Sequence, residues 1–216
     1  MKKANGILIF LLSVMLCMTL AMCQSVYADP INVGETIYLS TMVSGFNGGP
    51  FGVRTAQAGP VLFFTFCLER DEYFYPNQGY TVYGISDKAM AGGNNTNDGD
   101  LLDPKTAYLY TMFRNQSLPN WFNNNDLDDL ISLQIAIWLI EQEIDSTTNT
   151  KANDLVALAN NCGWKTIGDV RVINLGVNGL NQDQLVLVPE PSTLLLLGAG
   201  LLGLGILGRM KFRTKP

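Results

Sequence analysis

The chain has 216 residues with 19 acidic and 14 basic side chains, which gives a formal net charge of −5. A negative surface repels phosphate backbones, so we expect no nucleic acid among its partners. The sequence contains no histidine and only four cysteines. Histidine-dependent nucleophile pairs and zinc sites are therefore excluded, and we expect no cofactor and no metal.

Residues 1–28 have the pattern of a secretory signal peptide. Lys2 and Lys3 precede an apolar run from Ile7 to Met22, and small residues at the end of Val26–Ala28 suit signal peptidase cleavage before Asp29. Lipoprotein processing at Cys23 is an alternative, but the bulky residue before this cysteine fits it poorly. The sequence therefore predicts an exported protein whose mature domain begins at Asp29.

The first half of the mature domain predicts strands. Gly34–Gly45 begins with β-branched and aromatic residues, and Gly79–Ser86 has similar character. Gly59–Glu69 is a short, continuous apolar run, which is typical of a strand covered on both faces. Met90–Pro104 is polar and rich in glycine, so we expect a surface loop there.

Three helices are predicted next. Asp103 is a candidate N-cap before Pro104, a second helix runs from Asp126 to about Ile144, and a third lies within Asn149–Trp164. Strands are expected in 169–177 and 183–189. The order of strands, helices and strands predicts an α+β fold, a single secreted domain at 29–188 of antiparallel strands with a helical insertion.

Gln134 is unusual because it lies in the apolar stretch Leu133–Glu141. Helical spacing puts it on one stripe with Leu127, Leu130, Ile131, Ile137 and Trp138. An unsatisfied buried amide costs about 1–3 kcal/mol, so the side chain must be hydrogen-bonded or used chemically. Hydrogen bonds from the amide to the backbone of a neighbouring strand are the simplest explanation.

Cys67 is the second unusual residue, at the end of the most apolar predicted strand. Cysteines of exported proteins commonly form disulfides, and Cys162 is the only other cysteine of the mature domain. A Cys67–Cys162 disulfide is therefore the default expectation.

The stretch "FTFCLERDEYF", a "TAYLY" helix and the later "LQIAIWLIEQE" together resemble the bacterial surface thioester domain. In that family a cysteine in a strand motif bonds covalently to a glutamine in a helix motif. The resemblance implies a thioester crosslink between Cys67 and Gln134 in a pocket formed by Phe66, Ala136, Ile137 and Trp138. It also implies single-use attachment to an amine-bearing surface protein or matrix component, without enzymatic turnover. Glu69 or Glu141 could assist proton transfer.

The C-terminal segment 189–216 resembles the PEP-CTERM sorting signal. Pro189, Glu190 and Pro191 precede the apolar run Ser192–Gly208, and a basic tail follows. Seventeen residues reach about 25 Å as a helix, slightly less than a hydrocarbon core. The resemblance implies a membrane helix, a tether to the inner membrane through 192–208, and processing by exosortase. The cell surface or exopolysaccharide matrix would be the destination.

Other interpretations stay open at this point. The protein could be a noncovalent structural or carbohydrate-binding matrix protein with the Cys67–Cys162 disulfide and an aromatic face from Glu72–Pro76 and Gly79–Gly84. A hydrolase with paired carboxylates is compatible with the composition, but no spacing singles out a pair. Asn95–Asp103 is rich in oxygen ligands, yet it lacks the spacing of an EF-hand.

Overall fold

The computed structural model describes residues 29–43, 45–46, 48–91, 99–176, 181–188 and 198. The predicted signal peptide, the Pro189–Pro191 motif and the predicted apolar helix other than Gly198 lie outside these ranges. Within the described ranges, no helix is both long enough and apolar enough to span a bilayer.

The first antiparallel sheet contains four strands in the order β3-β2-β1-β4. The strands are β1 (Thr36–Thr41), β2 (Phe51–Arg54), β3 (Phe63–Thr65) and β4 (Gly79–Thr81). Side chains alternate between the two faces, so Ile37 and Leu39 of β1 are fully buried while Thr36 is exposed. Leu39 lies opposite Val53, and both belong to the apolar core on this face.

The second antiparallel sheet joins residues that are far apart in the chain. Its order is β5-β8-β9, with β5 (Gly84–Ser86), β8 (Val170–Asn174) and β9 (Gln184–Leu187). A further antiparallel pair is formed by β6 (Lys88–Ala89) and β7 (Asp100–Leu101). The predicted antiparallel strands with a helical insertion are confirmed, because the three helices within the described ranges lie between β7 and β8.

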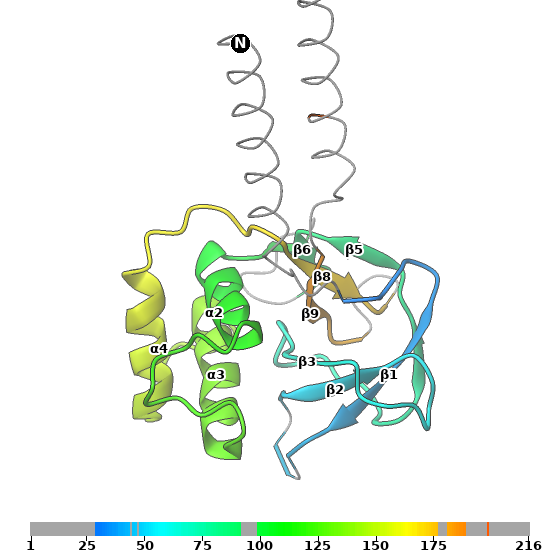
Figure 1. Cartoon of the computed structure of the whole chain (residues 1–216), viewed down its shortest axis with the longest axis horizontal. Helices are drawn as coiled ribbons and strands as arrows, with labels where there is room; N and C mark the ends of the chain where they lie inside the picture. Colours follow the sequence, from blue (N-terminus) through cyan, green and yellow to red (C-terminus); the bar gives the residue numbers. More distant parts are fainter. Residues whose placement is uncertain are drawn as a thin grey trace, which may run out of the picture.

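In the part of the chain that the structure describes, the helices are α2 (Pro104–Arg114), α3 (Leu127–Ile140) and α4 (Thr150–Asn160). Their side-chain N-caps are Asp103, Asp126 and Asn149, each of which accepts from a main-chain N–H in the first turn. Figure 1 shows the three helices grouped on one side of the strands. The helix starts were therefore predictable from capping residues.

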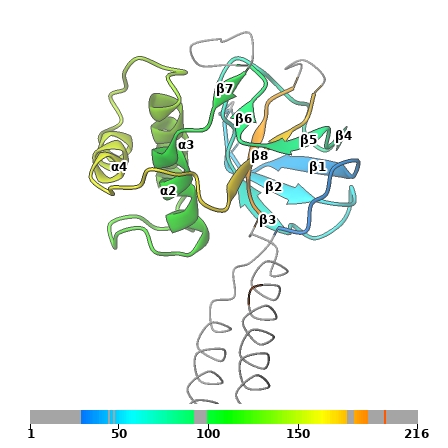
Figure 2. The ribbon, with the colours of Figure 1, turned by 90° about the horizontal axis from the view of Figure 1, so that it is seen from above.

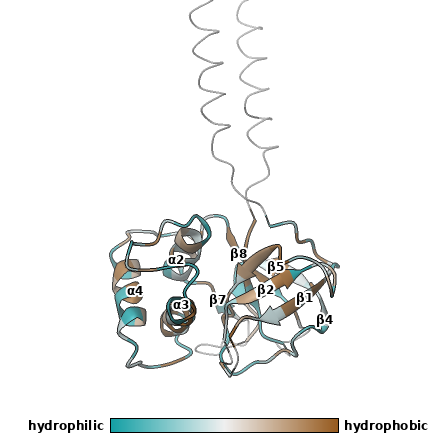
Figure 3. Ribbon diagram, turned by 60° about the horizontal axis from the view of Figure 1, so that its bottom comes forward, coloured by the Kyte–Doolittle hydropathy of each residue, from teal (hydrophilic) through white to brown (hydrophobic). Residues whose placement is uncertain are grey.

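One face of the second sheet packs against the helices and the other against the first sheet, and Figures 1 and 2 show the strands of both sheets on the same side of the helices. Successive side chains of β8 and β9 point to opposite faces of this sheet, so the sheet contributes to two apolar cores. Val172 and Leu185 belong to the core with the helices, whereas Ile173 and Val186 belong to the core with the first sheet. Figure 3 shows mainly apolar colouring on these inner elements and mixed colouring on the outer helix α4.

Several predicted boundaries were wrong. The run Gly59–Glu69 contributes only three strand residues, and Phe64 is 36% exposed because this outer face of β3 is uncovered. The predicted strand Gly79–Ser86 divides into β4 and β5 in different sheets. The expected loop Met90–Pro104 contains β7, which pairs with β6.

The predicted helix to Ile144 ends instead at Ile140. Gln142 has a φ of 63°, a left-handed conformation that an α-helix does not continue through. Leu127, which the helical stripe placed among buried residues, is 46% exposed because it is the first residue of α3. Boundary errors of this kind arise where tertiary contacts replace the local pattern.

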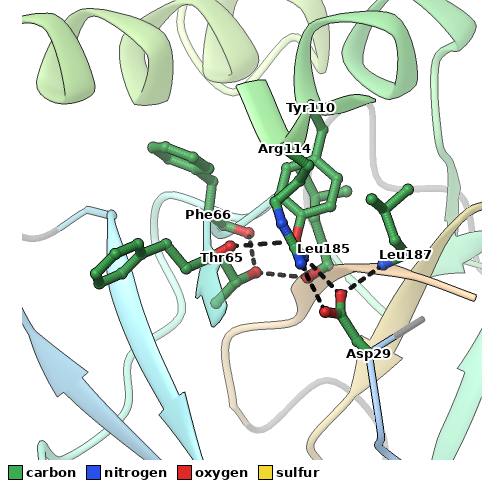
Figure 4. A network of polar contacts seen from close by, with 8 residues as sticks. Asp29, Thr65, Phe66, Tyr110, Arg114, Leu185 and Leu187 are labelled. Carbon is green, nitrogen blue, oxygen red and sulfur yellow. Dashed lines mark hydrogen bonds and ion pairs between the residues drawn. The ribbon is translucent and has the colours of Figure 1, made fainter. Parts of the chain in front are cut away.

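Asp29 is held at the junction of both sheets and α2 (Figure 4). Arg114 donates two hydrogen bonds of 2.7 Å to its carboxylate, and the N–H of Leu187 donates a third at 2.9 Å. The hydroxyl of Tyr110 accepts from Arg114 and donates to the carbonyl of Leu185. The main-chain N–H of Asp29 also donates to the carbonyl of Leu187, so the start of the domain is fastened beside the end of β9.

We expect Arg114→Ala to lower the free energy of unfolding by about 3–5 kcal/mol, because it leaves the Asp29 carboxylate buried and unpaired. Urea denaturation measures the change. Lys105→Ala is the matched control, since its pair with Asp103 spans 3.9 Å and is much more exposed. The control should cost less than about 1 kcal/mol. Equal losses in both variants would contradict the assignment of Asp29–Arg114 as a buried structural pair.

Candidate functional site

Cys67 follows β3 and is fixed by hydrogen bonds on both sides. The N–H of Leu185 donates to the carbonyl of Phe66, and the N–H of Leu68 donates to the carbonyl of Asp183. Cys67 itself forms an isolated antiparallel bridge with Gln184. The strand-like alternation directs Phe66 into the core with the helices and Cys67 into the core with the first sheet.

Gln134 lies on α3, at the boundary between these two cores. Its neighbours Leu133 and Ile137 belong to the helical core, whereas Trp138 belongs to the core that contains Cys67. Both Gln134 and Cys67 are 0% exposed. The predicted burial of the amide is therefore confirmed.

The side chains of Cys67 and Gln134 are in contact, with Sγ 3.4 Å from Oε1. The carbonyl oxygen of Gln134 also accepts from two main-chain N–H groups, that of Gly49 at 2.8 Å and that of Cys67 at 3.1 Å. Its Nε2 donates to the carbonyl of Cys67 at 2.9 Å. The expected hydrogen bonds to neighbouring backbone thus exist, and they orient the amide toward the thiol.

Two glycines allow the chain before β2 to approach Gln134. A Cβ on Gly48 would lie 2.7 Å from Cγ of Gln134 and 2.7 Å from the Trp138 ring. A Cβ on Gly49 would lie 2.8 Å from Oε1 of Gln134 and 3.0 Å from the carbonyl oxygen of Thr65. Only glycine therefore fits at these positions without displacing the amide.

The predicted pocket residues around Cys67 and Gln134 belong to two different cores. Trp138 is 5% exposed and contacts Phe46 with ring centroids 5.7 Å apart. Of the other predicted pocket residues, Phe66 packs against Phe113 at 5.1 Å, and Ala136 and Ile137 are fully buried in the helical core. Trp138 is thus the predicted pocket residue that shares the core of Cys67.

Burial raises the pKa of the Cys67 thiol well above its ordinary value, and the nearby Glu69 carboxyl raises it further. The N–H of Gly49 and the indole of Trp138 act in the opposite direction. The buried indole nitrogen of Trp138 forms no hydrogen bond with the described residues. It therefore lowers the pKa of the thiol less than the N–H of Gly49 does. The resting group is a neutral thiol.

Glu69 and Asp183 form a second buried polar group beside Cys67. Both residues are 0% exposed, and the N–H of Asp183 donates to Oε2 of Glu69 at 2.6 Å. Burial, followed by the charge of Asp183, raises the pKa of Glu69 well above its usual range. Because neither carboxyl reaches solvent, this pair offers no accessible cleft for the hydrolase considered above.

The predicted Cys67–Cys162 disulfide is wrong, because both thiols are free. Cys162 follows α4, is partly exposed, and its sulfur accepts from the N–H of Trp164 at 3.3 Å. Cys67 is enclosed in the core on the side of the first sheet. The disulfide was expected because Cys162 is the only other cysteine of the mature domain, and a count of cysteines does not show where in the fold each sulfur lies.

Sequence reasoning missed Gly49 and Asp183. The Gly-Gly-Pro sequence at 48–50 has the composition of a loop, although paired glycines are also found where a backbone approaches another group closely. Asp183 had no distinguishing local pattern. Within the described ranges no cluster of metal-binding side chains is present, and part of Asn95–Asp103 lies outside those ranges.

Comparison with known proteins identifies the C-terminal segment. Residues 187–212 match the PEP-CTERM protein-sorting motif, which includes the predicted Pro189–Pro191. This motif indicates exosortase-dependent export to the cell surface, with sorting at the membrane before release. No curated protein and no solved structure matches the chain. The resemblance to the thioester domain has no support from these comparisons.

We expect Gly49→Ala to destabilise the fold by about 1–3 kcal/mol, because its Cβ would press on the Gln134 oxygen and on rigid backbone. The displaced amide would lose the hydrogen bond from residue 49. Urea denaturation measures the loss of stability. A variant as stable as the natural protein would contradict the close approach described here.

Glu141 is a buried carboxyl, away from the thiol, that makes the stability of the fold depend on pH. It caps the end of α3 and accepts from the N–H of Asp103 at 3.2 Å. Burial raises its pKa from 4.5 to about 8. Between these two pH values the folded chain keeps a proton on Glu141 that the unfolded chain releases. The contribution of this proton to stability is complete below pH 4.5 and is lost as the pH rises through about 8.

Urea denaturation at about pH 5 and about pH 8.5 tests this linkage. The natural protein should be less stable at the higher pH, and Glu141→Gln should remove part of that difference. Asp154→Asn is the control, because Asp154 is exposed on α4 and should leave the difference unchanged. An unaltered pH dependence in Glu141→Gln would show that this carboxyl does not carry the proton.

Proposed function

We propose that this exported protein attaches covalently to a partner amine through a thioester between Cys67 and Gln134. The supporting observation is the contact of Sγ with a carbonyl oxygen that already accepts two main-chain N–H groups. The carbonyl carbon is one bond from that oxygen. Reacting groups held this close gain effective molarities of about 10⁵ M or more.

The reaction balances without any co-reactant. Cys67 Sγ attacks the carboxamide carbon of Gln134, and the N–H groups of Gly49 and Cys67 stabilise the developing oxyanion. The carbon–nitrogen bond then breaks, and the nitrogen leaves as ammonia after taking the thiol proton. The product is a thioester that joins the two side chains.

Burial protects such a bond until an amine arrives. Both side chains are fully enclosed, and Trp138 with Phe46 covers them. Water is therefore excluded from the reactive carbonyl. An entering amine forms an amide with Gln134, and the carbon–sulfur bond breaks to release the Cys67 thiol. Because Gln134 stays bonded to the partner, the protein acts once and does not turn over.

The sorting signal indicates where the protein would meet a partner amine. Exosortase-dependent export delivers the protein to the cell surface. Amines on surface proteins or on matrix components are then the available nucleophiles. We infer that attachment serves to hold the protein in that surface or matrix layer after its release from the membrane.

Intact mass spectrometry of the exported protein tests the thioester. We expect a mass about 17 Da below that of the processed sequence, from the loss of one ammonia, and a methylamine adduct at Gln134. Cys67→Ala should abolish both signals, whereas Cys162→Ala should keep them because Cys162 lies beyond α4. Full sequence mass with no adduct in fresh, unheated protein would refute the proposal.

A noncovalent role in carbohydrate binding is the second candidate. Tyr73, Tyr75 and Tyr83 are 60%, 76% and 56% exposed, whereas the neighbouring Tyr80 is buried against Phe74. Exposed tyrosines in adjacent loops suit the faces of sugar rings. This role requires no bond between Cys67 and Gln134, so it predicts an unchanged mass and no adduct.

A further inference from the structure

The buried pair Glu69 and Asp183 has no part in the attachment chemistry described so far. Glu69 is two residues after Cys67, and Asp183 immediately precedes Gln184, the bridge partner of Cys67. The N–H of Asp183 donates to Glu69 Oε2. Two carboxyl groups therefore lie in the same buried region as the thiol.

The hydrogen-bond partners of the two carboxyls are unequal. Asp183 accepts from the N–H of Met90, from the N–H of Leu175 and from Nδ2 of Asn174, at 2.7–2.9 Å. Such donors stabilise an ionised carboxylate. Glu69 has only the one donor on Oε2, and its buried Oε1 has no partner among the described residues. The shared proton of the pair therefore belongs on Glu69.

The charge state of Glu69 matters to Cys67 because a negative Glu69 makes the thiolate less favourable. The Cys67 thiol must give up its proton to attack Gln134, so the sulfur is thiolate-like as the attack begins. It carries negative charge again when an amine displaces it. A proton on Glu69 removes an opposing charge from both steps.

We propose that Glu69 is a positioning residue that holds a proton shared with Asp183 and thereby permits charge to develop on the Cys67 sulfur. Loss of this proton would suppress both thioester formation and attack by an amine at alkaline pH. This inference rests on the thioester proposed above. Glu69 gains and loses no atoms in the reaction, because the thiol proton leaves on ammonia and the proton of the entering amine ends on Cys67.

The charged groups around the pair reinforce this effect. Glu72 follows β3 and adds to the negative field at Glu69, and Asp71 and Glu143 act in turn on Glu72. From β6, Lys88 contributes its carbonyl oxygen to Asn174. The two charges that raise the pKa of Glu69, those of Asp183 and Glu72, both belong to carboxyls, so ionisation of Glu69 adds negative charge beside them.

The pH dependence of methylamine incorporation tests the proposal on the purified exported protein. The rate constant, corrected for the fraction of free amine, should fall about tenfold at alkaline pH in the natural protein. Glu69→Gln mimics the neutral acid and should abolish this fall. Glu141→Gln is the control, since Glu141 contacts the start of α2 instead, and it should keep the fall.

Asp183→Asn is a second variant, and it should strengthen the alkaline suppression that Glu69→Gln abolishes. Removing the negative charge beside Glu69 lowers the pKa of Glu69, so the alkaline suppression should begin at a lower pH. Identical profiles in the natural protein, Glu69→Gln and Asp183→Asn would overturn the role of Glu69.

A readout that needs no thioester separates this proposal from the previous one. In a Gln134→Ala, Cys162→Ser background, Cys67 is the only thiol of the domain and its thiolate absorbance can be titrated. Adding Glu69→Gln should lower the pKa of this thiol by about one unit or more. An unchanged titration overturns the proposal. A shifted titration, together with no methylamine adduct in the natural protein, supports the action of Glu69 on the thiol and refutes the thioester instead.

Discussion

The hydrogen bonding of the fully buried Gln134 amide is the constraint on which the site depends. This amide lies where two apolar cores meet, and each of its polar atoms needs a partner there. The main chains of Gly49 and Cys67 supply those partners. To do so, the segment before β2 and the segment after β3 must both reach α3. The same contacts that satisfy the amide bring the thiol against it.

In this histidine-free sequence, three buried carboxyls hold their protons more tightly than ordinary carboxyls do. Glu69, Asp183 and Glu141 each have a pKa raised by burial, and they lie near different parts of the fold. Glu141 couples the end of α3 to the start of α2, whereas the Glu69–Asp183 pair adjoins Cys67. Mildly acidic conditions therefore favour both the packing of the helices and the proposed chemistry of the thiol.

The two ends of the domain are joined by the same residues that close its core. Asp29 pairs with Leu187 through both its main chain and its carboxylate, and Arg114 fixes that carboxylate from α2. The match to the sorting motif begins at Leu187 itself. The last strand, β9, thus leads directly into the segment that exosortase-dependent sorting uses.

The sequence by itself determined the targeting signal, the three helix starts and the identity of the two unusual residues. Capping residues such as Asp103 and Asp126, and the motif at Pro189–Pro191, are local patterns that need no partner from elsewhere. Only the tertiary structure decided that Cys67 meets Gln134 instead of Cys162, and that Gly49 and Asp183 belong to the same region. These contacts join segments that are far apart in the chain. They depend on which of the two cores each face of a strand packs against, and the local periodicity of the sequence does not specify that.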